Sequence, residues 1–203
     1  MAIVRIWSLL PVQRRRTRQL IKRDIVRLNF GCGDATRAGW ISVDRIFARD
    51  IDLVLDLRRP LPLPDCSVDL CYSEHFLEHL TPDEGQLHLD EVFRVLKRGG
   101  IYRVVVPDVI EFVKRYIEGD IDFFKMAFPW ADRPMQAIYS VANWNGEHRN
   151  ILDLAELERM GGIAGFSRVE KSAVNASQIS DLRIDTSGAQ RSAESLYVEL
   201  VKS

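Results

Sequence analysis

From Ile25 to the end of the chain, short apolar segments alternate with amphipathic ones. This alternation is typical of strands that helices connect into a mostly parallel sheet, because each crossover must return the chain to the same end of the sheet. The sequence therefore predicts an α/β, Rossmann-like fold with helices on both faces of the sheet. The expected strands are residues 25–30, 41–44, 52–55, 68–72, 101–106, 168–174 and 195–201.

Capping residues mark three helices between these strands. Thr81 is a favourable N-cap, and Glu84, three residues later, completes a capping box. Asp108 is a second N-cap. Glycine is the usual residue just beyond a helix end, so the glycine pairs 99–100 and 161–162 are expected to end two of the helices. The helices are expected over residues 82–98, 108–119 and 152–160.

Residues 119–150 carry six aromatic side chains but follow neither a helical nor a strand period. Two interpretations stay open at this point. The segment forms a lid over a site, as long irregular connections often do, or it is a helical insert whose aromatic side chains fill a core.

Composition limits the class of protein. The length of 203 residues and a hydrophobic content of 46% suit one globular domain with a full core. The three cysteines, Cys32, Cys66 and Cys71, form no CxxC pair. This pattern predicts a reducing compartment, and therefore a cytoplasmic location.

A basic arm, residues 1–24, precedes the predicted sheet. Residues 1–27 have a formal charge of +7, whereas the rest of the chain has −8. The apolar segment 3–10 is too short, and too interrupted by Arg5, to cross a membrane. It is expected either to lie on the anionic inner face of a membrane or to belong to a leader helix that packs on its own domain or on a second subunit.

Glycines and acids stand where the first three predicted strands end. Gly31 and Gly33 allow a tight turn that leaves the backbone open to a ligand. A dinucleotide fingerprint requires a third glycine where this chain has Thr36, so NAD is disfavoured. Asp44 ends the second strand, where a carboxylate can accept hydrogen bonds from ribose hydroxyls. Asp56 ends the third, where it can accept from an exocyclic amine.

These motifs occur in the same order as in a known enzyme family. The runs LNFGCGD (28–34), VD (43–44), DLRRPLPLPDCSVDL (56–70), SEHFLEHL (73–80) and EVFRVLKRGGI (91–101) resemble the class I S-adenosylmethionine-dependent methyltransferases, in the small branch related to methyltransferase type 11 domains. The resemblance implies a methyltransferase domain over residues 25–203, a seven-stranded sheet whose last strand is antiparallel, and S-adenosyl-L-methionine as cofactor. Asp44 follows Gly33 by only eleven residues, so the first crossover helix is expected to be truncated.

The resemblance also implies roles for individual residues. The turn after the first strand would contact the methionine part of the cofactor, Asp44 would bind the ribose, and Asp56 with Leu57 would bind the adenine. The residues of that turn are Phe30, Gly31, Cys32 and Gly33. Ser73, Glu74 and His75, after the fourth strand, would also bind the cofactor.

The run His75 to His79 also matches the HxxEH signature of inverted zinc proteases, in which two histidines bind zinc and Glu78 acts as base. The signature is short and the sequence signals no third ligand, so no metal is expected. His79 is then expected in the wall of the acceptor pocket.

The sequence says less about the methyl acceptor than about the cofactor. The chain lacks the Asn/Asp-Pro-Pro-aromatic motif that signals transfer to a planar nitrogen, and no nucleic-acid-binding module is apparent, so nucleic acid is an unlikely partner. The family implies a hydroxyl of a small molecule or glycan. His79 and His148 are the candidate bases, and Arg149 could pair with an anionic acceptor. The alternative is a non-catalytic cofactor-binding module that acts through a partner or a membrane.

Overall fold

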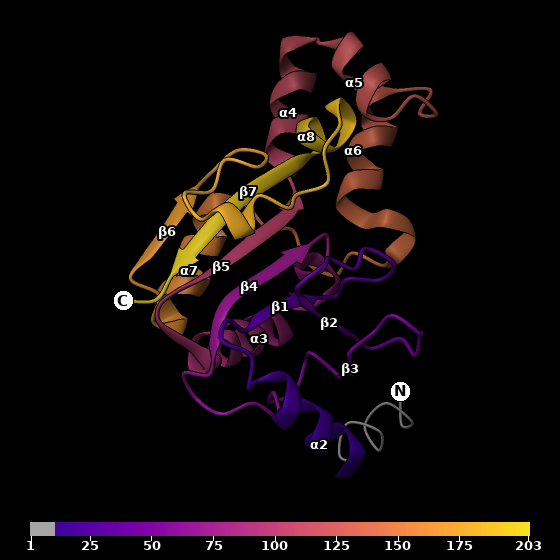
Figure 1. The fold of residues 1–203 in the computed structure, drawn as a ribbon. Helices are drawn as coiled ribbons and strands as arrows, with labels where there is room; N and C mark the ends of the chain where they lie inside the picture. Colours follow the sequence, from indigo (N-terminus) through magenta and orange to yellow (C-terminus); the bar gives the residue numbers. More distant parts are fainter. Residues whose placement is uncertain (1–10) are drawn as a thin grey trace.

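The computed structural model describes residues 11–203. The apolar segment 3–10, with its predicted membrane contact, lies outside the described residues. Seven strands form one sheet in the order β3-β2-β1-β4-β5-β7-β6 (Figure 1). Adjacent strands from β1 to β5 pair in parallel, whereas β7 is antiparallel to both of its neighbours. The predicted fold is confirmed. The strands are β1 (Arg27–Phe30), β2 (Ile41–Asp44), β3 (Leu53–Val54), β4 (Val68–Glu74), β5 (Leu96–Pro107), β6 (Arg168–Lys171) and β7 (Ser195–Val201).

The first three connections contain no helix. Gly31 N–H donates to the Val43 carbonyl at 2.8 Å, so the chain leaving β1 turns directly over the end of β2. Turns and bends alone connect β1 to β2, β2 to β3 and β3 to β4. The truncation predicted for the first crossover is confirmed, and it extends to the next two. No helix therefore follows β1, β2 or β3 directly at the end of the sheet where the carboxyl ends of β1 to β4 lie.

Helices α3 (Pro82–Val95) and α7 (Leu154–Ala164) pack together against one face of the sheet. The predicted capping box is present, because Thr81 Oγ1 accepts from Glu84 N–H and Glu84 Oε2 accepts from Thr81 N–H. The predicted glycine ends are wrong in both cases. Residues 99 and 100 lie inside β5, where Gly99 N–H donates to the Lys202 carbonyl at 2.6 Å.

In α7, Gly161 and Gly162 continue the helix to Ala164, and Gly165, with φ of +103°, ends it. A Cβ at Gly161 would lie 2.7 Å from Val169 of β6. This glycine therefore serves close packing of the helix on the sheet, which a sequence cannot separate from a helix stop.

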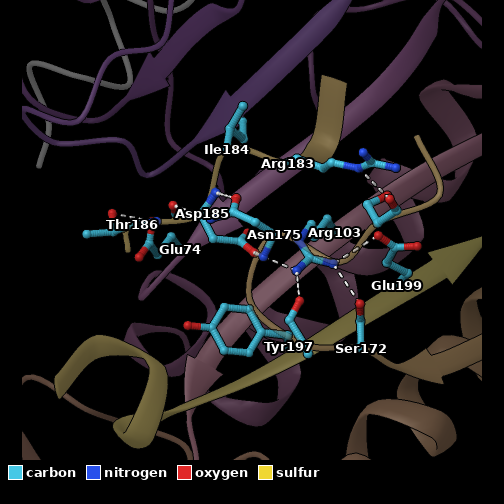
Figure 2. A network of polar contacts seen from close by, with 12 residues as sticks. Glu74, Arg103, Ser172, Asn175, Arg183, Ile184, Asp185, Thr186, Tyr197 and Glu199 are labelled. Carbon is cyan, nitrogen blue, oxygen red and sulfur yellow. Dashed lines mark hydrogen bonds and ion pairs between the residues drawn. The ribbon is translucent and has the colours of Figure 1, made fainter. Parts of the chain in front are cut away.

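The connection between β6 and β7 covers the opposite face. It includes the 3-10 helix η3 (Ser180–Leu182), and Leu182 packs on Trp40, Tyr72 and Tyr197. Figure 2 shows how the connection is fixed: the buried Arg103 guanidinium on β5 donates to Asp185, Glu199, Ser172 and the Ala173 carbonyl. A fully buried charge requires this degree of pairing.

A helical lobe stands beyond one end of the sheet (Figure 1). Phe123, Phe124 and Phe128 from the aromatic segment 119–150 pack on Phe112 in a core of their own, whereas Trp130, Tyr139 and Trp144 stay exposed. The core-filling interpretation thus accounts for three of the six aromatic side chains, and the lid stays a prediction. The lobe contains α4 (Val109–Glu118), α5 (Ile121–Ala127), α6 (Pro134–Asn143), the 3-10 helix η2 (Trp144–Gly146) and α8 (Ala189–Glu194).

The described part of the basic arm packs on its own domain. Helix α2 (Pro11–Leu20) lies beside β3, with Thr17 buried and Leu20 and Ile21 against the main core. Arg16 pairs with Asp52 at 3.5 Å. Over residues 11–203, no helix has the length and apolar character that crossing a membrane requires.

Candidate active site

A cavity of about 520 Å³ opens where β1 to β4 end. One part is lined by five of the predicted cofactor-binding residues, Gly31, Gly33, Asp44, Asp56 and Leu57. The other part is lined by His75, Phe76, His79, Gly146, Glu147 and Arg149. Parallel α/β sheets bind ligands at this position, outside the carboxyl ends of the strands.

The two glycines of the first turn differ in what surrounds them. Both have left-handed φ values, +60° at Gly31 and +49° at Gly33. A Cβ at Gly31 would lie 2.3 Å from Phe76 Cδ2, so this glycine is required by packing. A Cβ at Gly33 would meet no protein atom within 4 Å. Gly33 therefore leaves open the space that a ligand can occupy.

Asp44 ties the turn to the end of β2. Its Oδ2 accepts from Gly33 N–H at 2.9 Å, and its Oδ1 accepts from Ile46 N–H at 3.0 Å. The short spacing from Gly33 is thus what allows direct contact between the turn and the acid. A carboxylate has about four acceptor positions, so two remain for ribose hydroxyls.

Asp56 and Arg58 form a two-point ion pair in the cavity wall. Arg58 Nε donates to Asp56 Oδ1 at 2.7 Å, and Nη2 donates to Oδ2 at 2.9 Å. The hydrogen bond from Arg58 is the main cause that lowers the pKa of Asp56, and burial opposes it. Asp56 is therefore a fixed, ionised acceptor. Arg58 was not predicted, although it stands in the motif run two residues after Asp56.

Four predicted cofactor residues lie outside the cavity lining. Phe30 packs in the core, and Ser73 Oγ hydrogen-bonds to the Tyr102 hydroxyl at 2.8 Å. Glu74 accepts from the Tyr72 and Thr186 hydroxyls on the other face of the sheet (Figure 2). The fourth is Cys32, which packs on Ile51 and Val54, and burial raises the pKa of its thiol to about 11.

His75 adopts a left-handed backbone, with φ of +51°. Its Nε2 lies 2.9 Å from Ser195 Oγ and its Nδ1 lies 3.5 Å from Glu78 Oε1. Burial lowers the pKa of His75 to about 3, so the ring is neutral near pH 7.

The structure brings the two predicted bases together. The rings of His79 and His148 are in edge-to-face contact, with centroids 5.0 Å apart. His79 lines the cavity, whereas His148 lies behind it with its Nε2 3.9 Å from Glu78 Oε1. Burial lowers the pKa of both histidines and raises that of Glu78 to about 8.

The zinc-protease arrangement is not formed. Residues 77–79 are a 3-10 helix, η1, and His75 precedes it in a left-handed conformation. The two histidines therefore do not share one α-helical face. Among residues 11–203, the side chains whose donor atoms could hold a metal ion together are instead Glu78, His79 and His148.

Sequence comparison finds similarity to known methyltransferases. Residues 28–104 match a family model described as a methyltransferase domain. A Mycolicibacterium smegmatis protein named "Probable S-adenosylmethionine-dependent methyltransferase" is 30% identical over 161 residues, which are 71% of this chain. The chain therefore contains a methyltransferase domain over residues 28–104 and is similar to S-adenosylmethionine-dependent methyltransferases. It spans about half the length of that relative, 52%.

Solved methyltransferases share the fold. A 1,6-didemethyltoxoflavin-N1-methyltransferase from Burkholderia thailandensis, with bound S-adenosylhomocysteine, has a TM-score of 0.53 at 13% identity, covering 98% of this chain and 81% of its own. A methyltransferase from Thermotoga maritima has a TM-score of 0.51 at 17% identity, covering 98% and 94%.

S-adenosyl-L-methionine is the cofactor of the methyltransferases that this chain resembles, and the cavity fits it. Gly33 leaves open space, Asp44 has acceptor positions left over, and Asp56 is a fixed acceptor.

Proposed function

We propose that the protein transfers the methyl group of S-adenosylmethionine to a hydroxyl of a small molecule or glycan. The observation that carries this proposal is the continuity of the cavity. The glycine turn with Asp44 and Asp56 lines the same space as the histidine wall, which contains His75 and His79. A methyl donor held at the first part would meet an acceptor held at the second. Holding two reactants in contact supplies much of the rate of such a displacement.

The chemistry assigns a task to each part of the cavity. The acceptor oxygen forms a bond to the methyl carbon as the carbon–sulfur bond breaks, and sulfur keeps the electron pair. The hydroxyl proton must leave the acceptor. We place the group that draws it off at the histidine wall, where the predicted bases His79 and His148 meet Glu78. The neutral, desolvated rings support this placement, since each keeps one ring nitrogen that can accept a proton at pH 7.

Charge at the cavity mouth supports a polar acceptor. Arg149 lines the cavity and pairs with Glu84 at 2.8 Å, and Arg45 lines the same cavity. Either guanidinium can contact acceptor oxygens with the donors that its first partner leaves free.

The test has two stages. Calorimetric titration with S-adenosylmethionine comes first, followed by transfer of isotopically labelled methyl groups to a panel of sugars, glycans and phenols. We expect saturable binding and labelling of an oxygen in at least one acceptor. Labelling only of nitrogen would reject the hydroxyl. Binding without turnover on any acceptor would favour the alternative, a non-catalytic module that acts through a partner.

The cellular setting is part of the same proposal. We place the enzyme in the cytoplasm, with residues 1–10 against the inner face of the membrane. The charge of +7 over residues 1–27 supports attraction to anionic lipid.

A further inference from the structure

We propose that Glu78, His79 and His148 bind one divalent transition-metal ion at the acceptor end of the cavity. The site rests on the proposed function only for its role in catalysis, because binding of the ion can be measured without cofactor or acceptor.

The geometry of the three side chains is the first observation. One donor atom from each lies within 4.8 Å of the other two. Bonds of about 2.0–2.2 Å in a tetrahedral zinc site place donor atoms roughly 3.4 Å apart. Movements of the donor atoms by roughly 1 Å, through side-chain rotation, would therefore bring them to zinc-binding distances. Two chain segments supply the donors: η1 carries Glu78 and His79, and His148 follows η2.

The Glu78 carboxylate is the second, independent observation. Its side chain is 2% exposed, and neither oxygen has a hydrogen-bond partner among the described residues. Two imidazole nitrogens lie within 4.0 Å of Glu78 Oε1, His75 Nδ1 at 3.5 Å and His148 Nε2 at 3.9 Å. Buried carboxylates are normally hydrogen-bonded, paired or bound to a metal. A cation between Glu78 and the two histidines would satisfy this one.

The histidines are held as metal ligands usually are. His148 Nδ1 lies 2.8 Å from the Val141 carbonyl, and His79 Nδ1 lies 3.2 Å from the Glu147 carbonyl. A carbonyl can only accept, so each Nδ1 carries the proton and each Nε2 keeps a free lone pair. Metal-binding histidines commonly donate their other ring N–H to a backbone carbonyl in this way. Trp144, stacked on His148 at 6.2 Å, restricts that ring further.

The donor set selects the class of ion. Two imidazoles and one carboxylate suit zinc or iron(II), whereas magnesium and calcium prefer oxygen ligands alone. Three protein ligands leave at least one coordination position open, as in catalytic rather than structural zinc sites. His79 borders the cavity, so that position can accept an oxygen of the acceptor. An ion there would lower the pKa of a bound hydroxyl, so that its proton could pass to water and neither histidine would have to accept it.

The experiment is a calorimetric titration of chelator-treated, full-length protein with ZnCl2, in a buffer without imidazole. We expect one equivalent to bind. Outer-shell changes already cost about 10–100-fold in metal affinity, so loss of a ligand in Glu78→Gln or His148→Gln should cost at least about 100-fold. The matched control is Asp122→Asn, which changes an exposed carboxylate to an amide on α5 and should bind zinc as the wild type does. MgCl2 should give no saturable heat.

Three results would overturn the site: no saturable zinc binding by the folded wild type, unchanged affinity in folded Glu78→Gln and His148→Gln, or magnesium binding as tight as zinc. Thermal unfolding checks that each variant is folded. Titration with S-adenosylmethionine is run on the same samples. Zinc binding without cofactor binding would reject the proposed function and keep the metal site, and the reverse result would do the opposite.

Discussion

Alanine at Gly31 and at Gly33 should separate the requirements of the fold from those of the site. Both glycines have left-handed φ values, where an L-residue costs roughly 1–2 kcal/mol. At Gly31 the added Cβ would also lie 2.3 Å from Phe76, and overpacking of this kind adds about 1–3 kcal/mol. At Gly33 the added Cβ would meet no protein atom within 4 Å. The two substitutions therefore share a backbone cost and differ in their surroundings.

We expect Gly31→Ala to lower the free energy of unfolding by about 2–5 kcal/mol and Gly33→Ala by about 1–2 kcal/mol. Each kcal/mol lowers the thermal unfolding midpoint of a chain of this size by about 2–4 °C, so the midpoints of the two variants should differ measurably. Gly33→Ala should instead lose cofactor affinity, because its methyl group enters space on the cavity wall. A loss of at least about tenfold, or 1.4 kcal/mol, is expected in calorimetry with S-adenosylhomocysteine. Wild-type affinity in Gly33→Ala, together with equal midpoints for the two variants, would refute the reasoning.

Three further predictions concern other parts of the chain. Arg103→Met leaves Asp185 and Glu199 without their cation and should lower the free energy of unfolding in urea by about 3–5 kcal/mol. A decrease of less than about 1 kcal/mol would contradict the role of Arg103 in fixing the connection between β6 and β7. Asp56 has a lowered pKa in the folded state, so its pair with Arg58 stabilises above about pH 4 and is lost as pH falls through that lowered value; Asp56→Asn should flatten this acid limb, and an unchanged profile would exclude the pair as its source. Deletion of residues 1–10 should reduce pelleting with anionic liposomes, and unchanged pelleting would remove the membrane proposal.

The parts of the fold that could be predicted depend on local pattern. Apolar runs of four to seven residues mark the strands because a strand that is covered on both faces is apolar throughout, and 195–201 and 41–44 match the buried strands β7 and β2. The capping box at Thr81 depends on residues three apart, so the sequence contains it entirely.

The errors came where a contact distant in sequence decides the local structure. Gly99 and Gly100 are typical helix-ending residues, yet pairing with the chain beyond β7 makes them strand. Gly161 stands inside its helix because Val169 of β6 and Leu200 of β7 leave no room for a side chain there. Neither partner is visible in a local window.

The candidate site shows the same division. Asp44 is the last residue of β2 and Asp56 lies two residues after β3, so strand assignment was enough to place them on the cavity. Glu78 and His79 stood in a motif whose zinc-protease interpretation pairs His79 with His75, and no metal was expected there; the fold instead brings them together with His148, 69 residues beyond His79. Glu74 was expected beside Ser73 among the cofactor-binding residues after the fourth strand. Consecutive residues of a strand point to opposite faces, which places Glu74 beside Thr186.

Direct titration of the purified, full-length protein with S-adenosylmethionine tests the central claim, that the ends of β1, β2 and β3 form a cofactor site. Saturable one-to-one binding in the range of about 1 µM to 1 mM is expected, with clear weakening in Asp44→Asn. A folded wild-type protein that shows no saturable uptake of S-adenosylmethionine or S-adenosylhomocysteine at several times that range would contradict it.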